Sequence, residues 1–467
     1  MKSKYLLLSI TLGLLLSVGL SVILGVQGGI VAAQGIANAA AASDGAIVLT
    51  AQAPISTAYV AVRFGTYDTI VRPITFTEPI SAYRALELSG LAFTTGDTGW
   101  GLFLCSIEDV GDSTPACSNG TRYWATYAWN GVDDRWESRM VGIADAMITE
   151  DGHVEGFSWS DPGWVPVDPA PAPALTGAWR ALAWLETQQD ADGSFGSGGS
   201  TAEVLMALGA NRMDAADLRQ STGGSALAAM WRQSRSLAES AAGVGKLAVA
   251  LAAQGSCWPY AVLRPMDHYS ATLGAFDADA APHAWAMLGM AALSETIPPT
   301  ATDYLLGLQQ PDGAWEWGAG WGTDTNSTAL ALQALIAAGE SPTSTAVISG
   351  VAYLEQAQNT DGGFPYSPVA SWGRDSDVNS TAYVVQALLA TGEDPVTGTW
   401  AINGTNPIAY LIGMQLDDGS FEWQTGSGSN QLTTQQAVTA LLYRPFPVRS
   451  AALSTCNAVF LPLANRN

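Results

Sequence analysis

Long stretches in the C-terminal half of the chain carry hydrophobic residues on every side of a helix. Residues 327–338 place Ala, Leu and Ile at all helical angles, which is typical of a helix that is buried all round. The preceding stretch, residues 301–309, has distinct apolar and polar faces, as expected of a helix that packs against a core from outside. The pattern therefore predicts pairs of helices, one outer and one inner.

A short motif recurs between the two helices of each pair. Gln is followed by Gly four positions later and by Phe or Trp two positions after that. Gly after a helical run indicates a helix end, because it accepts the left-handed backbone conformation there. Recurrence at spacings of roughly 40–60 residues indicates an array of similar units. The copies are Gln189-Gly193-Phe195, Gln309-Gly313-Trp315, Gln358-Gly362-Phe364 and Gln415-Gly419-Phe421, with a weaker copy, Gly274-Phe276, that lacks the Gln.

Alignment of the inner helices on their first turn defines one equivalent position in each unit. Near-even spacing of these positions predicts a closed ring of six inner and six outer helices over residues 175–446. The expected fold class is mostly α, an (α/α)6 toroid with a small β-rich α+β domain before it and a tail at residues 447–467. The equivalent positions are Thr201, Val244, His283, Thr328, Thr381 and Thr434.

Residues 55–160 differ in character, because their hydrophobic and polar residues alternate as in half-buried strands. A short helical run ends at Gly90, and Asn-Gly and Asp-Gly pairs predict tight turns between the strands. The Pro-rich residues 161–174 predict a semi-rigid linker between this domain and the toroid.

Composition places the chain among globular proteins, with 48% hydrophobic and 13% charged residues. A net charge of −23 argues against binding to nucleic acid or to anionic membrane surfaces.

The first 40 residues are typical of a targeting segment. Lys2 and Lys4 precede an apolar run over residues 5–26, and Ala37-Asn38-Ala39 suits signal peptidase cleavage. The run is also long enough for an uncleaved membrane anchor, which stays an alternative. Both interpretations predict a secreted or extracytoplasmic protein that meets a membrane only through this segment.

Export permits the cysteines to form disulfides. Cys105 and Cys117 enclose a short polar loop and are expected to form one. Cys257 and Cys456 are left for a second, although four cysteines allow three pairings. With only three His and no Cys-x-x-Cys pattern, no zinc site is expected.

The Gln–Gly–aromatic motifs resemble the repeats of the terpene cyclase and protein prenyltransferase superfamily, which implies an α/α toroid over residues 175–446. Class II cyclases of that superfamily protonate an alkene with the middle Asp of a DxDDTA pattern. In the two matching stretches here, 324–329 and 377–382, Asn326 and Asn379 hold that position, and an amide cannot donate such a proton. The zinc ligands of prenyltransferases have no counterpart in the matching positions.

Residues 55–160 are similar to the small β domain of the cobalamin carriers transcobalamin and intrinsic factor. The similarity rests on a strand, the helix YRALELSGL, the strand LCSI, Tyr123-Trp124 and a closing DGHVEGFSW. In those carriers the corrinoid lies between a toroid and this domain. The order of the two domains is reversed here.

Polar residues precede the inner helices by about one turn, and aromatic residues crowd the same loops. Parallel inner helices would place them around one mouth, as in a small-molecule site. Helix capping is the competing interpretation. Asp324 and Asp377 are the first candidates for a ligand or Ca²⁺, because Asn326 and Asn379 offer alternative caps. The predicted ligand-binding set is Asp279, Asp324, Asn326, Asp377, Asn379, His283, Trp315, Trp317, Trp372 and Trp423.

The leading hypothesis is a secreted, monomeric, non-catalytic protein that binds a small molecule or glycan at this mouth, under the N-terminal domain. Cobalamin is the candidate ligand that the resemblance names. One alternative is a terpenoid-cyclase-like or polysaccharide-acting enzyme, for which Asp324 and Asp377 would face each other across the mouth. The other is a cell-surface interaction module.

Overall fold

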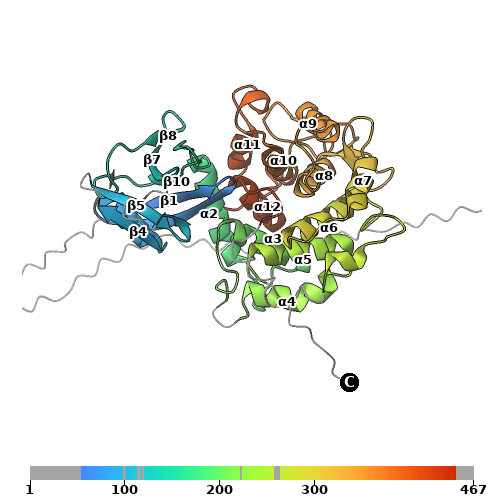
Figure 1. Cartoon of the computed structure of the whole chain (residues 1–467), viewed down its shortest axis with the longest axis horizontal. Coiled ribbons are helices and arrows are strands. Elements are labelled where there is room, and N and C mark those ends of the chain that lie inside the picture. Colours follow the sequence, from blue (N-terminus) through green and yellow to red (C-terminus); the bar gives the residue numbers. More distant parts are fainter. Residues whose placement is uncertain are drawn as a thin grey trace, which may run out of the picture. The chain divides into compact units, whose positions relative to one another are not determined.

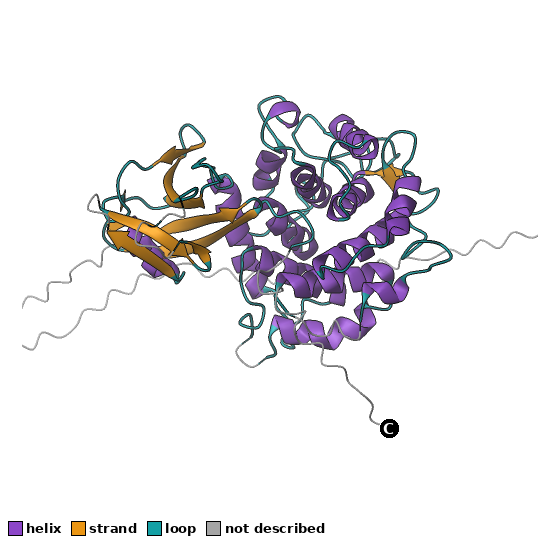
Figure 2. Cartoon of the chain, in the orientation of Figure 1, coloured by secondary structure: helices purple, strands orange, loops and turns teal. Residues whose placement is uncertain are grey.

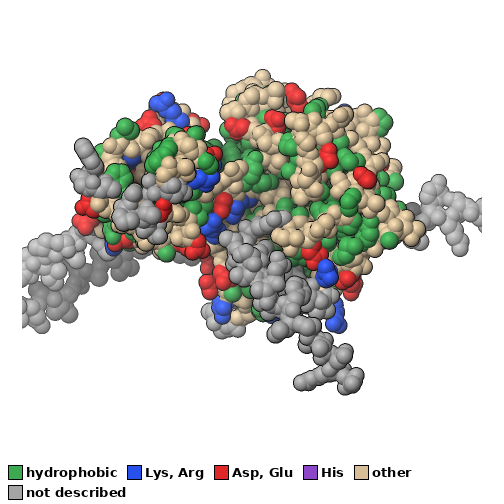
Figure 3. Space-filling model, viewed as in Figure 1, with side chains coloured by type: hydrophobic (Ala, Val, Ile, Leu, Met, Phe, Trp, Pro, Cys, Tyr) green, Lys and Arg blue, Asp and Glu red, His purple; other side chains and the backbone are tan. Residues whose placement is uncertain are grey.

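The computed structural model describes residues 54–97, 101–112, 117, 120–220, 223–256 and 263–448. The predicted targeting segment, Cys257 and Cys456 lie outside the described residues, as does most of the predicted tail. Among the described helices, none combines the length and apolar character needed to cross a membrane. On the face seen in Figure 3, acidic side chains are scattered over the surface rather than gathered in one patch.

The N-terminal domain is built on a five-stranded sheet with the order β2-β1-β10-β7-β8 (Figures 1 and 2). β1 and β10 are parallel, and the other neighbours are antiparallel. The elements are β1 (Ser56–Gly65), β2 (Asp68–Phe76), β3 (Ile80–Ser81), α1 (Ala82–Ser89), β4 (Phe93–Asp97), β5 (Leu102–Ile107), β6 (Val110–Gly111), β7 (Trp124–Asn130), β8 (Arg135–Ser138), β9 (Met147–Ile148) and β10 (Val154–Trp159).

The alternation seen in the sequence gives this sheet two apolar faces. Val60 and Val62 belong to a core that α1 covers, whereas Ala61 between them belongs to the core of the helical domain. Successive strand residues point to opposite faces, so both faces of the central strands are buried. The helix before Gly90 ends there as expected, with Gly90 at φ 75°.

Eleven further α-helices follow in the described residues and form the toroid (Figure 1). The predicted linker is partly helical, because α2 begins inside it. The helices are α2 (Ala172–Thr187), α3 (Gly198–Ala210), α4 (Ala226–Leu237), α5 (Ala241–Ala253), α6 (Ala280–Ala292), α7 (Pro299–Gly307), α8 (Thr325–Ala337), α9 (Thr345–Ala357), α10 (Val378–Thr391), α11 (Pro407–Gly413) and α12 (Gln431–Leu441). Two 3-10 turns, η1 (Pro265–His268) and η2 (Gly398–Trp400), and a short pair of strands, β11 (Trp315–Glu316) and β12 (Thr323–Asp324), complete it.

The predicted ring is closed. Each inner helix contacts the next in the order α3, α5, α6, α8, α10, α12, and α12 contacts α3 again. Helices α2, α4, α7, α9 and α11 pack outside them, and η1 packs against α5 and α6 where the outer ring has no described helix. The six aligned positions lie one on each inner helix, so the mostly α fold class with a small β-containing domain is confirmed.

The inner helices are packed tightly enough to require small residues. A Cβ on Gly245 of α5 would lie 2.1 Å from the Trp285 carbonyl oxygen of α6. A Cβ on Gly289 would lie 2.7 Å from the Gly245 Cα. Two glycines thus allow α5 and α6 to touch backbone to backbone.

Candidate functional site

The Gln of each repeated motif links neighbouring units of the ring. Its Nε2 donates to the carbonyl oxygen of its own Gly and to a carbonyl oxygen of the next unit. In the last copy the second acceptor is Gly177 in α2, so this bond joins the last unit to the first. The bonds run from Gln189 to Gly193 and Leu218, from Gln309 to Gly313 and Ala346, from Gln358 to Gly362 and Trp400, and from Gln415 to Gly419 and Gly177.

The aligned Thr positions anchor the same turns to the inner helices. Thr381 Oγ1 accepts from the backbone N–H of Phe364 at 2.9 Å and donates to the Asp377 carbonyl oxygen at 2.8 Å. Equivalent pairs of bonds occur at Thr201, Thr328 and Thr434. A buried backbone N–H therefore finds its acceptor in a side chain.

His283 takes the place of this Thr in α6. It is fully buried, its Nδ1 accepts from Phe276 N–H at 3.1 Å, and its Nε2 lies 2.9 Å from the Ala301 carbonyl oxygen. Burial lowers its pKa. Both ring nitrogens are engaged, so the predicted ligand role of His283 is replaced by a structural one.

Asp324 and Asp377 cap their helices, contrary to the argument that other residues would do so. Asp324 Oδ1 accepts from Ser327 N–H at 2.7 Å, and Asp377 Oδ1 accepts from Ser380 N–H at 2.8 Å. Asn326 and Asn379 lie inside the first helical turn instead. Asp279 is the exception, because its side chain makes no capping bond at the start of α6.

A cavity of about 570 Å³ opens at the N-terminal ends of the inner helices. Five aromatic side chains line it, and Tyr366 and Trp372 stack with ring centroids 5.2 Å apart. Much of the remaining lining is polar. The lining residues are Glu203, Lys246, Trp317, Asn326, Tyr366, Trp372, Gly373, Asp375, Asp377, Asn379, Ser380, Tyr383, Trp423, Gln424, Leu432 and Gln436.

The structure brings part of the predicted set together at this cavity. The members that line it are Asn326, Asp377, Asn379, Trp317, Trp372 and Trp423. Asp279, Asp324, His283 and Trp315 do not line it. Trp315 is fully buried, and its Nε1 donates to the Leu305 carbonyl oxygen at 2.8 Å, because the motif aromatic fills the space between inner and outer helices. The proposed pair of carboxylates across the mouth is therefore wrong in its Asp324 member.

Sequence reasoning missed the residues deeper in the cavity. Glu203 and Lys246 form an ion pair, with Nζ to Oε1 at 2.6 Å. Each is the single charged residue of an otherwise apolar inner helix. Both stand two residues after the aligned position, as do Tyr383 and Gln436 in α10 and α12. The positions two residues after the aligned ones, read across all the repeats, would have identified all four.

Burial dominates the electrostatics of the two capping carboxyls. It raises the pKa of Asp324 from 3.8 to about 6, although the hydrogen bonds from Ser327 oppose it. It also raises the pKa of Asp377, against hydrogen bonds from Ser380 and Trp423. Asp377 is the one of the two that faces the cavity, so it combines access to a ligand with a tendency to hold its proton.

No group of three or more His, Cys, Asp or Glu side chains in the described part of the chain could hold a metal ion. The Ca²⁺ considered for Asp324 and Asp377 would also meet carboxyls already engaged in capping.

The N-terminal domain contacts the toroid at the end opposite the cavity. Asn211, which follows the last residue of α3, accepts from Val71 N–H at 2.9 Å and donates to the Val71 carbonyl oxygen at 3.2 Å. Asp68 pairs with Arg212 and with Arg444, which lies beyond α12. The cavity is lined by residues of the first two turns of the inner helices and of the loops before them, so the expectation that this domain covers the ligand is wrong. Within the domain, Cys105 and Cys117 form a disulfide.

The family model described as the squalene-hopene cyclase C-terminal domain matches residues 201–446, just over half of the chain. This chain belongs to that family. The match begins in the first inner helix and ends after the last, so it covers the six inner helices and the outer helices between them, α4, α7, α9 and α11.

Solved structures similar to the chain include cyclases. The type II terpene cyclase MstE from Scytonema is 17% identical, covers 58% of this chain and 98% of its own, and has a TM-score of 0.43. The ent-copalyl diphosphate synthase from Streptomyces platensis is 20% identical over 52% of this chain and 49% of its own, with a TM-score of 0.35. A protein from Actinoplanes is 18% identical over 58% and 99%, with a TM-score of 0.38. Identities this low bear on the fold alone.

Membership of the squalene-hopene cyclase C-terminal domain family overturns the leading functional hypothesis. A non-catalytic, corrinoid-binding protein was expected, and that expectation was wrong. The family favours the alternative, a terpenoid-cyclase-like enzyme. The hypothesis gave too much weight to the two Asn residues, because it treated the loss of one acid position as the loss of every acid in the mouth.

Proposed function

We propose that the chain is a cyclase-like enzyme that protonates an alkene of an isoprenoid substrate in the toroid mouth. The observation that carries the proposal is the buried carboxyl of Asp377 in the wall of an aromatic-lined cavity. Asn326 and Asn379 occupy the position of the family's acid and cannot supply the proton. Asp377, at the start of the same stretch as Asn379, supplies it instead.

Protonation of an alkene requires a general acid and groups that stabilise the resulting positive charge. A general acid must keep its proton until the substrate is bound, and burial favours this by raising the pKa of Asp377. The proton passes from the Asp377 oxygen to one alkene carbon and leaves positive charge on the other. The rings of Trp317, Trp372 and Trp423 can stabilise that charge as it develops. Loss of a proton at the end makes the reaction an isomerisation.

Incubation with squalene, farnesol and geranylgeraniol in deuterated buffer tests the proposal. The expected product is a cyclic isomer that carries one solvent deuterium, detected by gas chromatography and mass spectrometry. Asp377→Asn should abolish it, because the amide has no acidic proton. Asp375→Asn is the matched control, since Asp375 lines the same cavity but is exposed. Equal activity of the Asp377 variant would contradict the assigned acid.

The pH dependence gives a second check. Catalysis needs the protonated carboxyl, so the rate should fall as pH rises through the pKa of Asp377, which lies above the ordinary value of 3.8. A rate that instead rises with pH would point to a general base.

Two further expectations stay proposals. The apolar N-terminal run supports export, with the mature chain outside the cytoplasm and any membrane contact through that segment. The resemblance of residues 55–160 to the small β domain of the cobalamin carriers also stays a proposal, and it rests on the sequence motifs alone. Edman sequencing of the secreted protein would test the first.

A further inference from the structure

The inner end of the cavity is polar, although the inner helices are mostly apolar. A second cavity of about 10 Å³ lies there and shares Glu203, Tyr383 and Gln436 with the main one. A space of that size admits about one water-sized group. We call it the floor subsite; its lining is Glu203, Met206, Tyr383, Gln386, Gln435, Gln436, Thr439 and Phe446.

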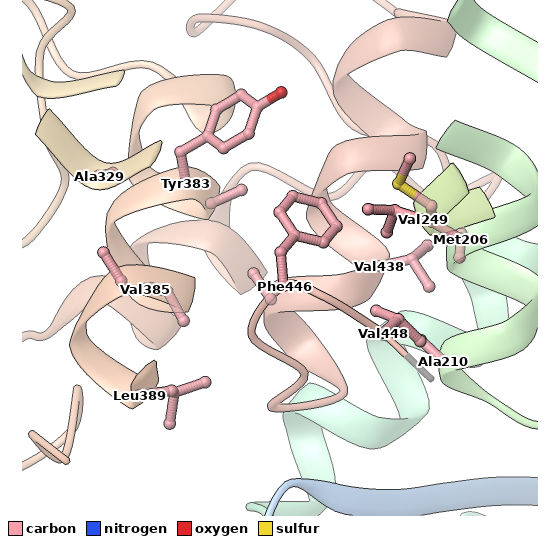
Figure 4. Packing of buried hydrophobic residues seen from close by; sticks show 14 of the residues in the cluster. Met206, Ala210, Val249, Ala329, Tyr383, Val385, Leu389, Val438, Phe446 and Val448 are labelled. Carbon is pink, nitrogen blue, oxygen red and sulfur yellow. The ribbon is translucent and has the colours of Figure 1, made fainter. Parts of the chain in front are cut away.

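Phe446 closes the floor subsite from below. Its ring lies 5.1 Å from that of Trp285 and 6.4 Å from that of Tyr383, and its N–H donates to Gln333 Oε1 at 2.8 Å. Figure 4 shows Phe446 in the packed interior with Tyr383 on one side and Met206 on the other. The segment that follows α12 therefore forms the inner end of the floor subsite.

The orientation of the Gln435 amide follows from its neighbours. Gln435 Nε2 lies 3.2 Å from Glu203 Oε2 and 3.4 Å from Ser200 Oγ. A carboxylate only accepts hydrogen bonds, so the nitrogen must face Glu203. Gln435 Oε1 is then left buried without a hydrogen-bond partner in the described structure, on a side chain that is 1% exposed.

The other amides of the floor subsite each have one described donor bond, and each Nε2 carries a second N–H. Gln386 Nε2 donates to the Arg444 carbonyl oxygen at 3.0 Å. Gln436 Nε2 lies 3.4 Å from the Tyr383 hydroxyl. Lys246, at the edge of the main cavity, is already paired with Glu203. Gln435 Oε1, beside the Glu203 carboxylate, thus still calls for a hydrogen-bond donor.

We infer that the floor subsite binds a hydroxyl group at the inner end of the substrate, which donates to Gln435 Oε1. A phosphate or carboxylate there would place its negative charge beside the Glu203 carboxylate and the Gln435 oxygen. A hydrocarbon end would leave the buried oxygen unsatisfied. The inference rests on the proposed function for the nature of the chain, and it makes the substrate an isoprenoid alcohol.

The geometry of α10 agrees with a substrate bound in this direction. Tyr383 and Gln386 follow Asp377 by six and nine residues, which corresponds to about 9 and 13 Å along the helix. With its hydroxyl in the floor subsite, the alcohol would extend toward the mouth and place a distant alkene near Asp377.

Binding of three matched ligands tests the inference without any variant. Farnesol, its methyl ether and farnesyl phosphate would be titrated into the full chain, and dissociation constants read from the fluorescence of the cavity tryptophans. The alcohol should bind about tenfold tighter than the ether, which lacks the donor, and tighter than the phosphate. An ether or phosphate that binds as tightly as the alcohol would overturn the inference, and so would absence of binding by all three.

Two variants test whether Gln435 causes the preference for the alcohol. Gln435→Met should weaken alcohol binding to the level of the ether and leave ether binding unchanged. Gln424→Met makes the same change at the outer part of the cavity and should keep the preference. Retained preference in the Gln435 variant, with native circular dichroism, would refute the assigned acceptor.

The result is separable from that of the proposed function. Tight alcohol binding without deuterated product would leave the floor subsite standing and remove the cyclase. Deuterated products from squalene, with no preference for the alcohol over its ether, would support the cyclase and refute hydroxyl binding in the floor subsite.

Discussion

At the start of α8, two opposing effects act on the charge of the Asp324 carboxyl. Its carboxyl caps the helix through the Ser327 N–H, which favours the charged form. The side chain is fully buried, which disfavours charge, and Oδ2 has no hydrogen bond within the described residues. Burial prevails and raises the pKa to about 6. A capping residue thus becomes a titrating group near neutral pH.

The raised pKa of Asp324 predicts how the free energy of unfolding depends on pH. Because it lies above the ordinary 3.8, the folded chain binds the proton more tightly, and the Asp324 contribution to the free energy of unfolding falls as pH rises from about 4 to about 6. Asp324→Asn keeps the cap, as Asn430 does in α12, and removes the charge. The variant should exceed the wild type by up to about 3 kcal/mol at pH 8 and match it below pH 4 in urea unfolding.

Asp418→Asn is the control for this prediction. Asp418 is almost fully solvated, and hydrogen bonds from Ser420 lower its pKa. Removal of its charge should therefore reduce stability above pH 4 rather than increase it. If both variants showed the same pH profile, burial would not be the cause of the Asp324 effect.

At the scale of elements, the ring depends on one repeated side-chain bridge. Gln415 Nε2 donates to the carbonyl oxygens of Gly419 and Gly177, at 2.9 and 2.8 Å, and so joins the last motif to α2. The other motif glutamines bridge units that follow each other directly in sequence. Gln415 bridges the two ends of the toroid sequence.

Loss of this bridge should destabilise the whole toroid. Gln415→Leu removes the two hydrogen bonds that Nε2 donates and the one that Oε1 accepts from Arg180. The two carbonyl oxygens are left with one partner fewer, which corresponds to about 2 kcal/mol in the free energy of unfolding. Gln310→Leu is the matched control, because within the described residues Gln310 Nε2 bonds only to the nearby Leu308 carbonyl oxygen. Its effect should stay within about 0.5 kcal/mol. Chemical denaturation of both variants measures the difference, and equal losses would deny the closing bond its role.

The repeat alignment predicted the elements better than it predicted the site. The apolar inner helices and the Gly-centred turns follow from local physics, and all six aligned positions lie on inner helices. Thr and Asp at the helix starts are ambiguous, because the same residue types cap helices and bind ligands. Asp377 caps α10 and lines the cavity, whereas Asp324 caps α8 and does not line it.

The deeper lining shows why the rest of the site was missed. Glu203 and Lys246 are single charges in apolar helices, and nothing in either helix alone shows that they meet. Their contact follows from ring closure, which brings equivalent turns of neighbouring inner helices together. Gln435 is recognisable as an acceptor only once the Glu203 carboxylate beside it is placed.

At the scale of the whole molecule, the N-terminal domain and the toroid share a core and a charged contact. Asp68 lies between Arg212 and Arg444, and Arg444 is 8% exposed. Burial lowers the pKa of Arg444, with Asp68 opposing the shift. Removal of the carboxylate would leave two guanidinium groups facing each other at the contact.

Asp68→Ala should therefore weaken the attachment of the domain more than an exposed ion pair would. The expected loss is about 3 kcal/mol, typical for a buried pair that loses one partner. Calorimetry should show the single unfolding transition split in two. Glu87→Ala breaks the exposed pair with Arg84 and should change stability by less than about 1 kcal/mol. A single, unshifted transition in the Asp68 variant would mean that the apolar contact alone joins the domains.

The closed ring of inner helices has a consequence for local unfolding. Open stacks of helical repeats have terminal units that contact one neighbour and open first. Here α3 and α12 contact each other, so every inner helix has two neighbours and the array has no end from which to fray. Amide hydrogens of all six inner helices should then exchange with solvent with one common free energy of opening under native conditions, through a single concerted opening of the circle.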